Sequence, residues 1–222
     1  MWRDAALVAV KDLRIELRSR VVLYQVAPFA VLVLVLFAFA LGPDPAPMAQ
    51  AAPGLFWVAV LFASVLAVQR SYAVESTDAM RDGLRLAGLD PAGIFLGKAL
   101  AIVAQLLVLE ALLTAGVILL YGDGVHSVGT LIGSALVGTL GLAPVGVLYG
   151  ALSSGLRVRE TLLPLLLLPV AAPVLVAGTR AWQSALGTAA VSQGQWMGLL
   201  AVFAAVYLSM GVVLYGPLQE AA

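Results

Sequence analysis

The sequence predicts an all-α integral membrane protein, organised as one domain over residues 1–222, and three observations lead to that prediction. Of the 222 residues, 62% are hydrophobic and 11% are charged, and the mean hydropathy is +1.04. A soluble core made from a chain of this length cannot hide so much apolar surface. Apolar stretches long enough to cross a ~30 Å hydrocarbon layer recur along the chain. The charged residues gather between these stretches, so the apolar surface is expected to face lipid.

Composition also excludes several classes of function. The formal net charge is zero, which makes nucleic acid a poor partner. The chain has no cysteine and a single histidine, His126, so one chain offers no disulfide, thiolate site or multi-histidine metal site. For His126, a solvated loop residue is favoured over an axial haem ligand. We therefore expect no catalytic residue and no metal in this chain.

Residues 2–20 predict an amphipathic helix that lies along the membrane surface. At about 100° per residue, five apolar residues share one face: Ala6, Val10, Leu13, Leu17 and Val21. Three basic residues form a stripe beside that face, suited to lipid phosphates: Lys11, Arg14 and Arg18. Asp12 and Glu16 are expected on the other flank. A solvated charged leader is the alternative, and it is less favoured because the apolar face continues into a membrane span.

Six membrane-spanning helices are predicted after that segment. They cover residues 21–41, 53–68, 94–121, 128–152, 161–178 and 196–214. Pro28 is expected to kink the first span, and Pro53 to begin the second. The Asp90-Pro91 pair predicts the start of the third helix, because a capping side chain precedes a proline. The fourth span contains two GxxxG pairs and is expected to pack closely against neighbouring helices. The fifth contains three prolines.

The distribution of basic residues predicts the orientation. Of the 12 Lys and Arg residues, all but Arg180 fall in segments that alternating spans place on one side. Lys and Arg concentrate on the cytoplasmic side of membrane proteins. Both termini and the charged segment 69–93 should therefore be cytoplasmic.

Segment 69–93 is predicted to be a coupling loop for a separate ATPase. Its charge density and helix-capping signals indicate a short helix that docks into a groove of that partner. Met80 and Leu84 are the expected apolar anchors. The predicted contact residues are Met80, Arg81, Asp82, Gly83, Leu84 and Arg85. The run Gly93–Lys98 faintly resembles a phosphate-binding loop, but its glycines are one residue too close and Ala99 replaces the Mg²⁺-binding hydroxyl. The chain is therefore not expected to hydrolyse nucleotide by itself.

Glu110 lies near the middle of the third predicted span. A charge is costly there, which by default favours a functional residue. The alternative is a structural glutamate that is protonated or hydrogen-bonded in a helix interface, with Gln105 or Thr114 as partner. The sequence leaves both interpretations open.

Several stretches, taken in order and spacing, resemble the cytochrome c maturation permease family CcmB. They are residues 41–45, 52–59, 70–72, Glu75, 82–84, 96–99 and 162–173. The resemblance implies the membrane subunit of an ABC transporter that exports or delivers haem in c-type cytochrome biogenesis, in the bacterial cytoplasmic (inner) membrane. It implies a CcmA ATPase that binds the ATP, the membrane proteins CcmC and CcmD, and release of the haem-loaded chaperone CcmE. Haem is then the cargo of the complex and is not bound by this chain directly.

Two other interpretations stay open. One is an ABC-2-type permease for another cargo, such as a lipid, glycan or drug. Six spans and an N-terminal interfacial helix resemble the fold of such exporters. The other is a membrane scaffold without transport activity. Because ABC motors carry two ATPase domains, two membrane halves are needed, and a second copy of this chain is the simplest second half.

Overall fold

The computed structural model describes residues 1–20, 24, 26–42, 45–74, 88–121, 125–153, 159–189 and 192–221. All the regular structure in this part of the chain is helical. The helices are α1 (Trp2–Ser19), α2 (Ala27–Leu41), α3 (Pro45–Val74), α5 (Pro91–Tyr121), α6 (Val128–Ser153), α7 (Arg159–Ala185) and α8 (Gln193–Ala221). Within the described residues, five helices are long and apolar enough to cross a membrane: α3, α5, α6, α7 and α8. The prediction of a helical membrane protein is confirmed.

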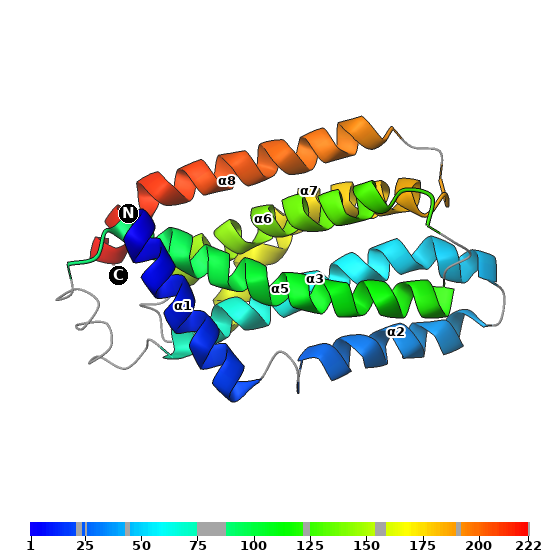
Figure 1. Ribbon diagram of the computed structural model, residues 1–222, viewed down its shortest axis with the longest axis horizontal. Helices are drawn as coiled ribbons and strands as arrows, with labels where there is room; N and C mark the ends of the chain where they lie inside the picture. Colours follow the sequence, from blue (N-terminus) through cyan, green and yellow to red (C-terminus); the bar gives the residue numbers. More distant parts are fainter. Residues whose placement is uncertain are drawn as a thin grey trace.

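The helices form an elongated bundle with one helix across its end. Figure 1 shows α2, α3, α5, α6, α7 and α8 running roughly along the long axis, with α1 crossing them obliquely. Both chain termini lie at the end that carries α1. We call this the α1 end, formed by α1, the first turns of α5 and the last turns of α8, and the opposite end the far end. The bundle thus has one polar end at which segments distant in the sequence meet.

The first apolar helix is shorter than predicted. α2 has 15 residues, which at ~1.5 Å per residue gives about 22 Å. Residues 21–23 and 25 of the predicted span lie outside the described part. Pro28 occupies the first turn of α2, and Tyr24 and Val26 before it are π-helical, so the predicted kink at Pro28 stays a prediction. Proline suits a helix start because its missing N–H has no intrahelical partner there. Gly42, with φ +78°, follows the last residue.

Proline has the opposite role in α3. The helix begins at Pro45, so Pro53 lies inside it and the prediction of Pro53 as its start is wrong. A proline in the interior removes one backbone hydrogen bond, which membrane helices tolerate when neighbouring helices support them. The start of α5 is confirmed as predicted. It begins at Pro91, and the Ala92 N–H donates to Asp90 Oδ1 at 3.0 Å.

Helix α6 is the packing centre of the bundle. Of the most apolar 18 residues of α6, 72% are buried inside the bundle. The corresponding share in α8 is only 17%. A Cβ added at Gly146 would lie closer than 3.0 Å to Val68, and one at Gly150 would clash with the Tyr72 ring. This GxxxG pair therefore provides the close contact with α3 that was predicted. The other pair begins at Gly129, which has no atom within 4 Å of an added Cβ.

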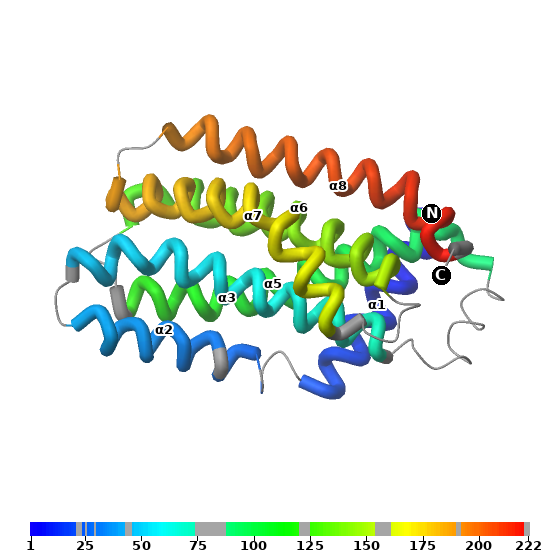
Figure 2. Tube along the Cα trace, turned by 180° about the vertical axis from the view of Figure 1, so that it is seen from behind, coloured from blue at the N-terminus to red at the C-terminus, as the bar shows by residue number. Residues whose placement is uncertain are grey.

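Helix α7 bends along its course (Figure 2). It contains Pro164, Pro169 and Pro173, and prolines are the usual cause of such bends. Beyond them, α7 continues to Ala185, further than the predicted span. Its Trp182 ring stacks on Phe56 of α3 with centroids 3.7 Å apart, which ties α7 to α3 near the far end.

Candidate functional site

Two glycines on α5 form the seat on which α1 rests. A Cβ added at Gly93 would lie 2.8 Å from Asp4 Cβ, and one at Gly97 would lie 2.6 Å from Val8 Cβ. Only glycine permits this approach, since any other residue would push α1 away. The stretch that faintly resembled a phosphate-binding loop is therefore a helix-packing surface. The GxxxG spacing of Gly93 and Gly97 is the sequence signal from which this packing surface could have been predicted.

Helix α1 has two distinct faces. Ala5, Val8 and Glu16 are buried, and the Asp12 side chain is only 10% exposed, so the acidic residues point into the protein instead of forming an outer flank. The opposite face exposes three apolar side chains: Leu7, Val10 and Leu17. Val10 and Leu17 belong to the predicted apolar face, and Leu7 lies beside it. The acids turn inward because cationic side chains of α3 and α5 lie beneath α1.

The basic stripe is divided between the two faces. Arg14 and Arg18 are exposed. Lys11 is half-buried, and its Nζ lies 3.1 Å from Asp12 Oδ1. An ion pair inside the protein competes with lipid phosphate for this ammonium group. Arg3 is exposed and adds a basic residue that the prediction omitted.

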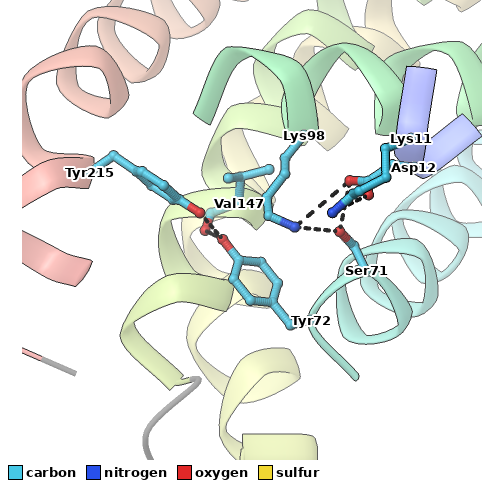
Figure 3. A network of polar contacts seen from close by, with 7 residues as sticks. All are labelled: Lys11, Asp12, Ser71, Tyr72, Lys98, Val147 and Tyr215. Carbon is cyan, nitrogen blue, oxygen red and sulfur yellow. Dashed lines mark hydrogen bonds and ion pairs between the residues drawn. The ribbon is translucent and has the colours of Figure 1, made fainter. Parts of the chain in front are cut away.

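Lys98 lies at the centre of a polar network at the α1 end (Figure 3). Its side chain is 1% exposed. The ammonium group lies 3.7 Å from Asp12 Oδ2 on α1 and donates a hydrogen bond of 3.1 Å to Ser71 Oγ on α3. It also lies 4.9 Å from the centroid of the Tyr72 ring. A buried ammonium group is tolerated only with such partners. The network therefore joins α1, α3 and α5.

Tyr72 extends the network to two more helices. Its hydroxyl donates to the Val147 carbonyl of α6 at 2.8 Å and lies 3.3 Å from the Tyr215 hydroxyl of α8 (Figure 3). Gly150 provides the space for the Tyr72 ring. Five helices are thus connected through side chains that surround Lys98.

A second ion pair lies beside the first. Arg70 Nε on α3 is 3.1 Å from Glu16 Oε2 on α1, held by charge without an aligned hydrogen bond. A cavity of about 20 Å³ adjoins this pair, enough for one water molecule. Its polar lining is Asp12, Glu16, Arg70, Ser71 and Gln105. The contact between α1 and α3 therefore leaves room for a water molecule, and Asp12 and Ser71, the polar partners of Lys98, line the same cavity.

The first turn of α1 is bonded to the residue that precedes α5. The Asp90 N–H donates to Asp4 Oδ2 at 3.3 Å, and this hydrogen bond holds the pKa of Asp4 below its usual value. α1 therefore contacts both sides of segment 75–87: Arg70 and Ser71 before it, and Asp90 after it. The predicted ATPase contacts, Met80, Arg81, Asp82, Gly83, Leu84 and Arg85, lie outside the described residues.

Glu110 lies inside the bundle, apart from this network. It is 2% exposed, and Thr139 of α6 donates a 2.5 Å hydrogen bond to its Oε1. Among the described residues, no group bonds Oε2. Thr114, one of the expected partners, donates to the backbone carbonyl of Glu110 instead of the carboxyl group. Gln105, the other, lines the cavity near α1. The sequence missed Thr139 because it lies on another helix.

His126 lies at the far end and is exposed. Its backbone N–H donates to the Ala185 carbonyl at 2.9 Å, and its ring lies against Gly187. Across the described parts of the chain, no three His, Cys, Asp or Glu side chains are grouped closely enough to hold a metal ion.

The comparison with known proteins covers nearly the whole chain. The family model described as CcmB protein matches residues 3–216. The chain belongs to the CcmB family. The predicted resemblance is confirmed, and the CcmB stretches 70–72 and 96–99 prove to be the two sides of the Lys98 network.

Curated relatives match over most of their length. Heme exporter protein B of Paracoccus denitrificans is 33% identical over 178 residues, covering 78% of this chain and 79% of the relative. That of Haemophilus influenzae is 30% identical over 215 residues, covering 96% and 93%. That of Pseudomonas aeruginosa is 32% identical over 184 residues, covering 82% and 81%.

Proposed function

We propose that this CcmB protein is the membrane subunit of an ABC transporter that exports or delivers haem for c-type cytochrome biogenesis. The observation that carries the proposal is the match over nearly the whole chain to CcmB, together with relatives named heme exporter protein B. The five long apolar helices agree with a permease. The chain itself is not an enzyme in this proposal, and ATP hydrolysis belongs to a separate subunit.

The proposed topology has six membrane crossings, as in ABC-2-type exporters. The sixth crossing is α2 together with the residues before it, since α2 alone is about 22 Å long. Both termini lie at the α1 end (Figure 1), which an even number of crossings requires. The excess of Lys and Arg at that end supports its assignment to the cytoplasm and the protein's place in the inner membrane.

Segment 69–93 is the proposed contact for a CcmA-like ATPase, with Met80 to Arg85 inserted in a groove of that partner. Its support is the position of the segment: both of its sides are attached to α1 at the polar end of the bundle. The other proposed partners are CcmC-like and CcmD-like membrane proteins, a CcmE-like haem chaperone and a second copy of this chain. Haem is the cargo, released on the chaperone when ATP is hydrolysed.

The outer face of α1 is the proposed contact with membrane lipid. Leu7, Val10 and Leu17 would enter the apolar layer, while Arg14 and Arg18 meet lipid phosphates. The exposure of these five side chains on one face supports this contact.

Affinity purification in mild detergent tests the proposal. The tagged chain should retain an ATPase and haem-handling proteins, and Leu84→Asp should release the ATPase because a charge replaces an apolar anchor. Ser192→Asp, at an exposed site of the far end, is the matched control and should change nothing. Retention of the ATPase by Leu84→Asp would place the docking site elsewhere.

The choice of cargo needs a separate measurement. Deletion of the chain should abolish maturation of c-type cytochromes, and the wild-type chain should restore it. Normal cytochrome maturation in the deletion strain would favour a permease for a lipid, glycan or drug.

A further inference from the structure

We propose that Lys98 is the positioning residue that makes α1 and the two sides of segment 75–87 move as one unit. Among the side chains that the structure describes, Lys98 is the one buried cation. It contacts a carboxylate of α1 and a hydroxyl of α3 while it is itself anchored on α5. The structural observation is independent of cargo, and only its use in transport rests on the proposed function.

Among the described residues, three ionic contacts join α1 and its N-cap Met1 to the rest of the bundle, and the Asp12–Lys98 pair is the most buried of them. The Met1 amino group lies 3.4 Å from Asp90 Oδ2, and both groups are about 40% exposed. Asp12 is 10% exposed and Lys98 1%, whereas Arg70 in the third pair is 30% exposed. Exposed ion pairs contribute little, because water and salt screen them. Breaking a buried pair is costly, because it leaves a charge without a partner. Lys98 is therefore expected to dominate the docking of α1.

The position of α1 makes this docking relevant to segment 75–87. Asp4 accepts a hydrogen bond from Asp90, at one side of the segment. Asp12 is bonded by Ser71 and Lys98, at the other side. Gly93 and Gly97 fix the distance between α1 and α5, since an added Cβ at either would clash with α1. A force on the segment from a bound partner therefore displaces α1 as long as the Asp12–Lys98 pair is intact.

Cysteine labelling tests the docking directly, because the natural chain has no cysteine. Val8→Cys places one thiol on the buried face of α1, where Val8 is 2% exposed. Its reaction rate with a maleimide then follows the fraction of molecules in which α1 leaves its seat. Ser19→Cys, at an exposed position of the same helix, is the control. Lys98→Met should raise the rate at Val8→Cys about tenfold and leave the control rate unchanged.

A double-mutant cycle separates the ion pair from a general loss of structure. Asp12→Asn alone should raise the Val8→Cys rate, and adding Lys98→Met should raise it by much less than the product of the single effects. Lys98→Arg, which keeps the charge, should lie close to wild type. Should Lys98→Met fail to fold, Asp12→Asn and Lys98→Arg still give opposite expected results. An unchanged rate in Lys98→Met or Asp12→Asn, or purely multiplicative effects, would overturn the proposal.

The last experiment measures the labelling rate in the complex of this chain with the ATPase subunit. In wild type, addition of ATP should change the Val8→Cys labelling rate, and in Lys98→Met this response should be lost although the ATPase stays bound. A full response in Lys98→Met would show that α1 is driven by another route and would overturn the role of Lys98. If no ATPase is bound even by wild type, the proposed function fails, while the labelling of the isolated chain still decides the docking.

Discussion

The Lys98 network and the Glu110–Thr139 pair solve the same problem in different ways. Each places an ionisable side chain in an apolar helical bundle, at 1% and 2% exposure. Lys98 has a carboxylate, a hydroxyl and an aromatic ring around it, taken from two other helices. Glu110 has one hydroxyl from one helix, and no group among the described residues bonds its Oε2.

This difference indicates which of the two sites stabilises the observed conformation. A polar network with all members bonded holds its helices in one arrangement. A buried oxygen without a protein partner costs free energy and calls for an explanation, of which a functional role is one. We therefore expect substitutions around Lys98 to disturb assembly, and substitutions at Glu110 to disturb transport more than folding.

Gly150→Leu should displace Tyr72 from the Lys98 network and cause the largest loss of stability among these variants. A side chain at Gly150 would occupy the place of the Tyr72 ring and push α3 from α6. Overpacking of this kind costs about 3 kcal/mol. Thermal unfolding in detergent and the yield of inserted protein measure it. Gly129→Leu, on the same helix with no atom near an added Cβ, is the control, and equal losses in both variants would show that the helix simply requires glycine.

Glu110→Ala should lower haem delivery while ATP turnover persists. It leaves the Thr139 hydroxyl without its acceptor, a loss of roughly 1–3 kcal/mol in a buried place. Glu110→Gln keeps an acceptor for Thr139 and should retain most of the stability, which separates folding from function. Maturation of c-type cytochromes and ATPase rate are the measurements. Normal maturation in both variants would make Glu110 a structural residue.

Tyr72→Phe should have an intermediate effect on stability. The variant loses the hydrogen bond to the Val147 carbonyl and the contact with Tyr215, so the buried carbonyl keeps only its partner within α6. The expected loss is about 1 kcal/mol. Tyr215→Phe keeps the hydrogen bond from Tyr72 to the Val147 carbonyl and should lose less. Unfolding temperatures of the two variants give the comparison, and a larger loss in Tyr215→Phe would contradict the assignment of the carbonyl bond to Tyr72.

The contact between Asp4 and Asp90 should give the smallest effect, and one that depends on pH. The hydrogen bond from the Asp90 N–H lowers the pKa of Asp4 below its ordinary value of 3.8. The stabilisation is therefore present above that ordinary value and is lost as the pH falls through the lower value of the folded protein. Asp4→Asn should remove this dependence. Thermal unfolding in detergent between pH 6 and 3 would reveal it as a small loss of stability at low pH that Asp4→Asn does not show.

Local signals in the sequence predicted much of the fold. Asp90-Pro91 set the start of α5, and the glycines of α6 marked the most buried helix, because capping and close packing depend on residues a few positions apart. One proline misled the prediction. Pro53 lies inside α3 and does not begin it, whereas Pro28 occupies the first turn of α2. Proline fits both places, and only the neighbouring helices decide between them.

The sequence by itself determined the membrane class, the helical architecture and the concentration of basic residues at one end, since these follow from composition and order along the chain. The tertiary structure decided the partners. It turned Asp12 and Glu16 inward, made Gly93 and Gly97 the seat of α1, and brought Thr139 to Glu110. Helical periodicity states which residues share a face, but it does not state what that face meets. A buried charge takes its partner from whichever helix packs beside it, and that choice is made only when the whole bundle is assembled.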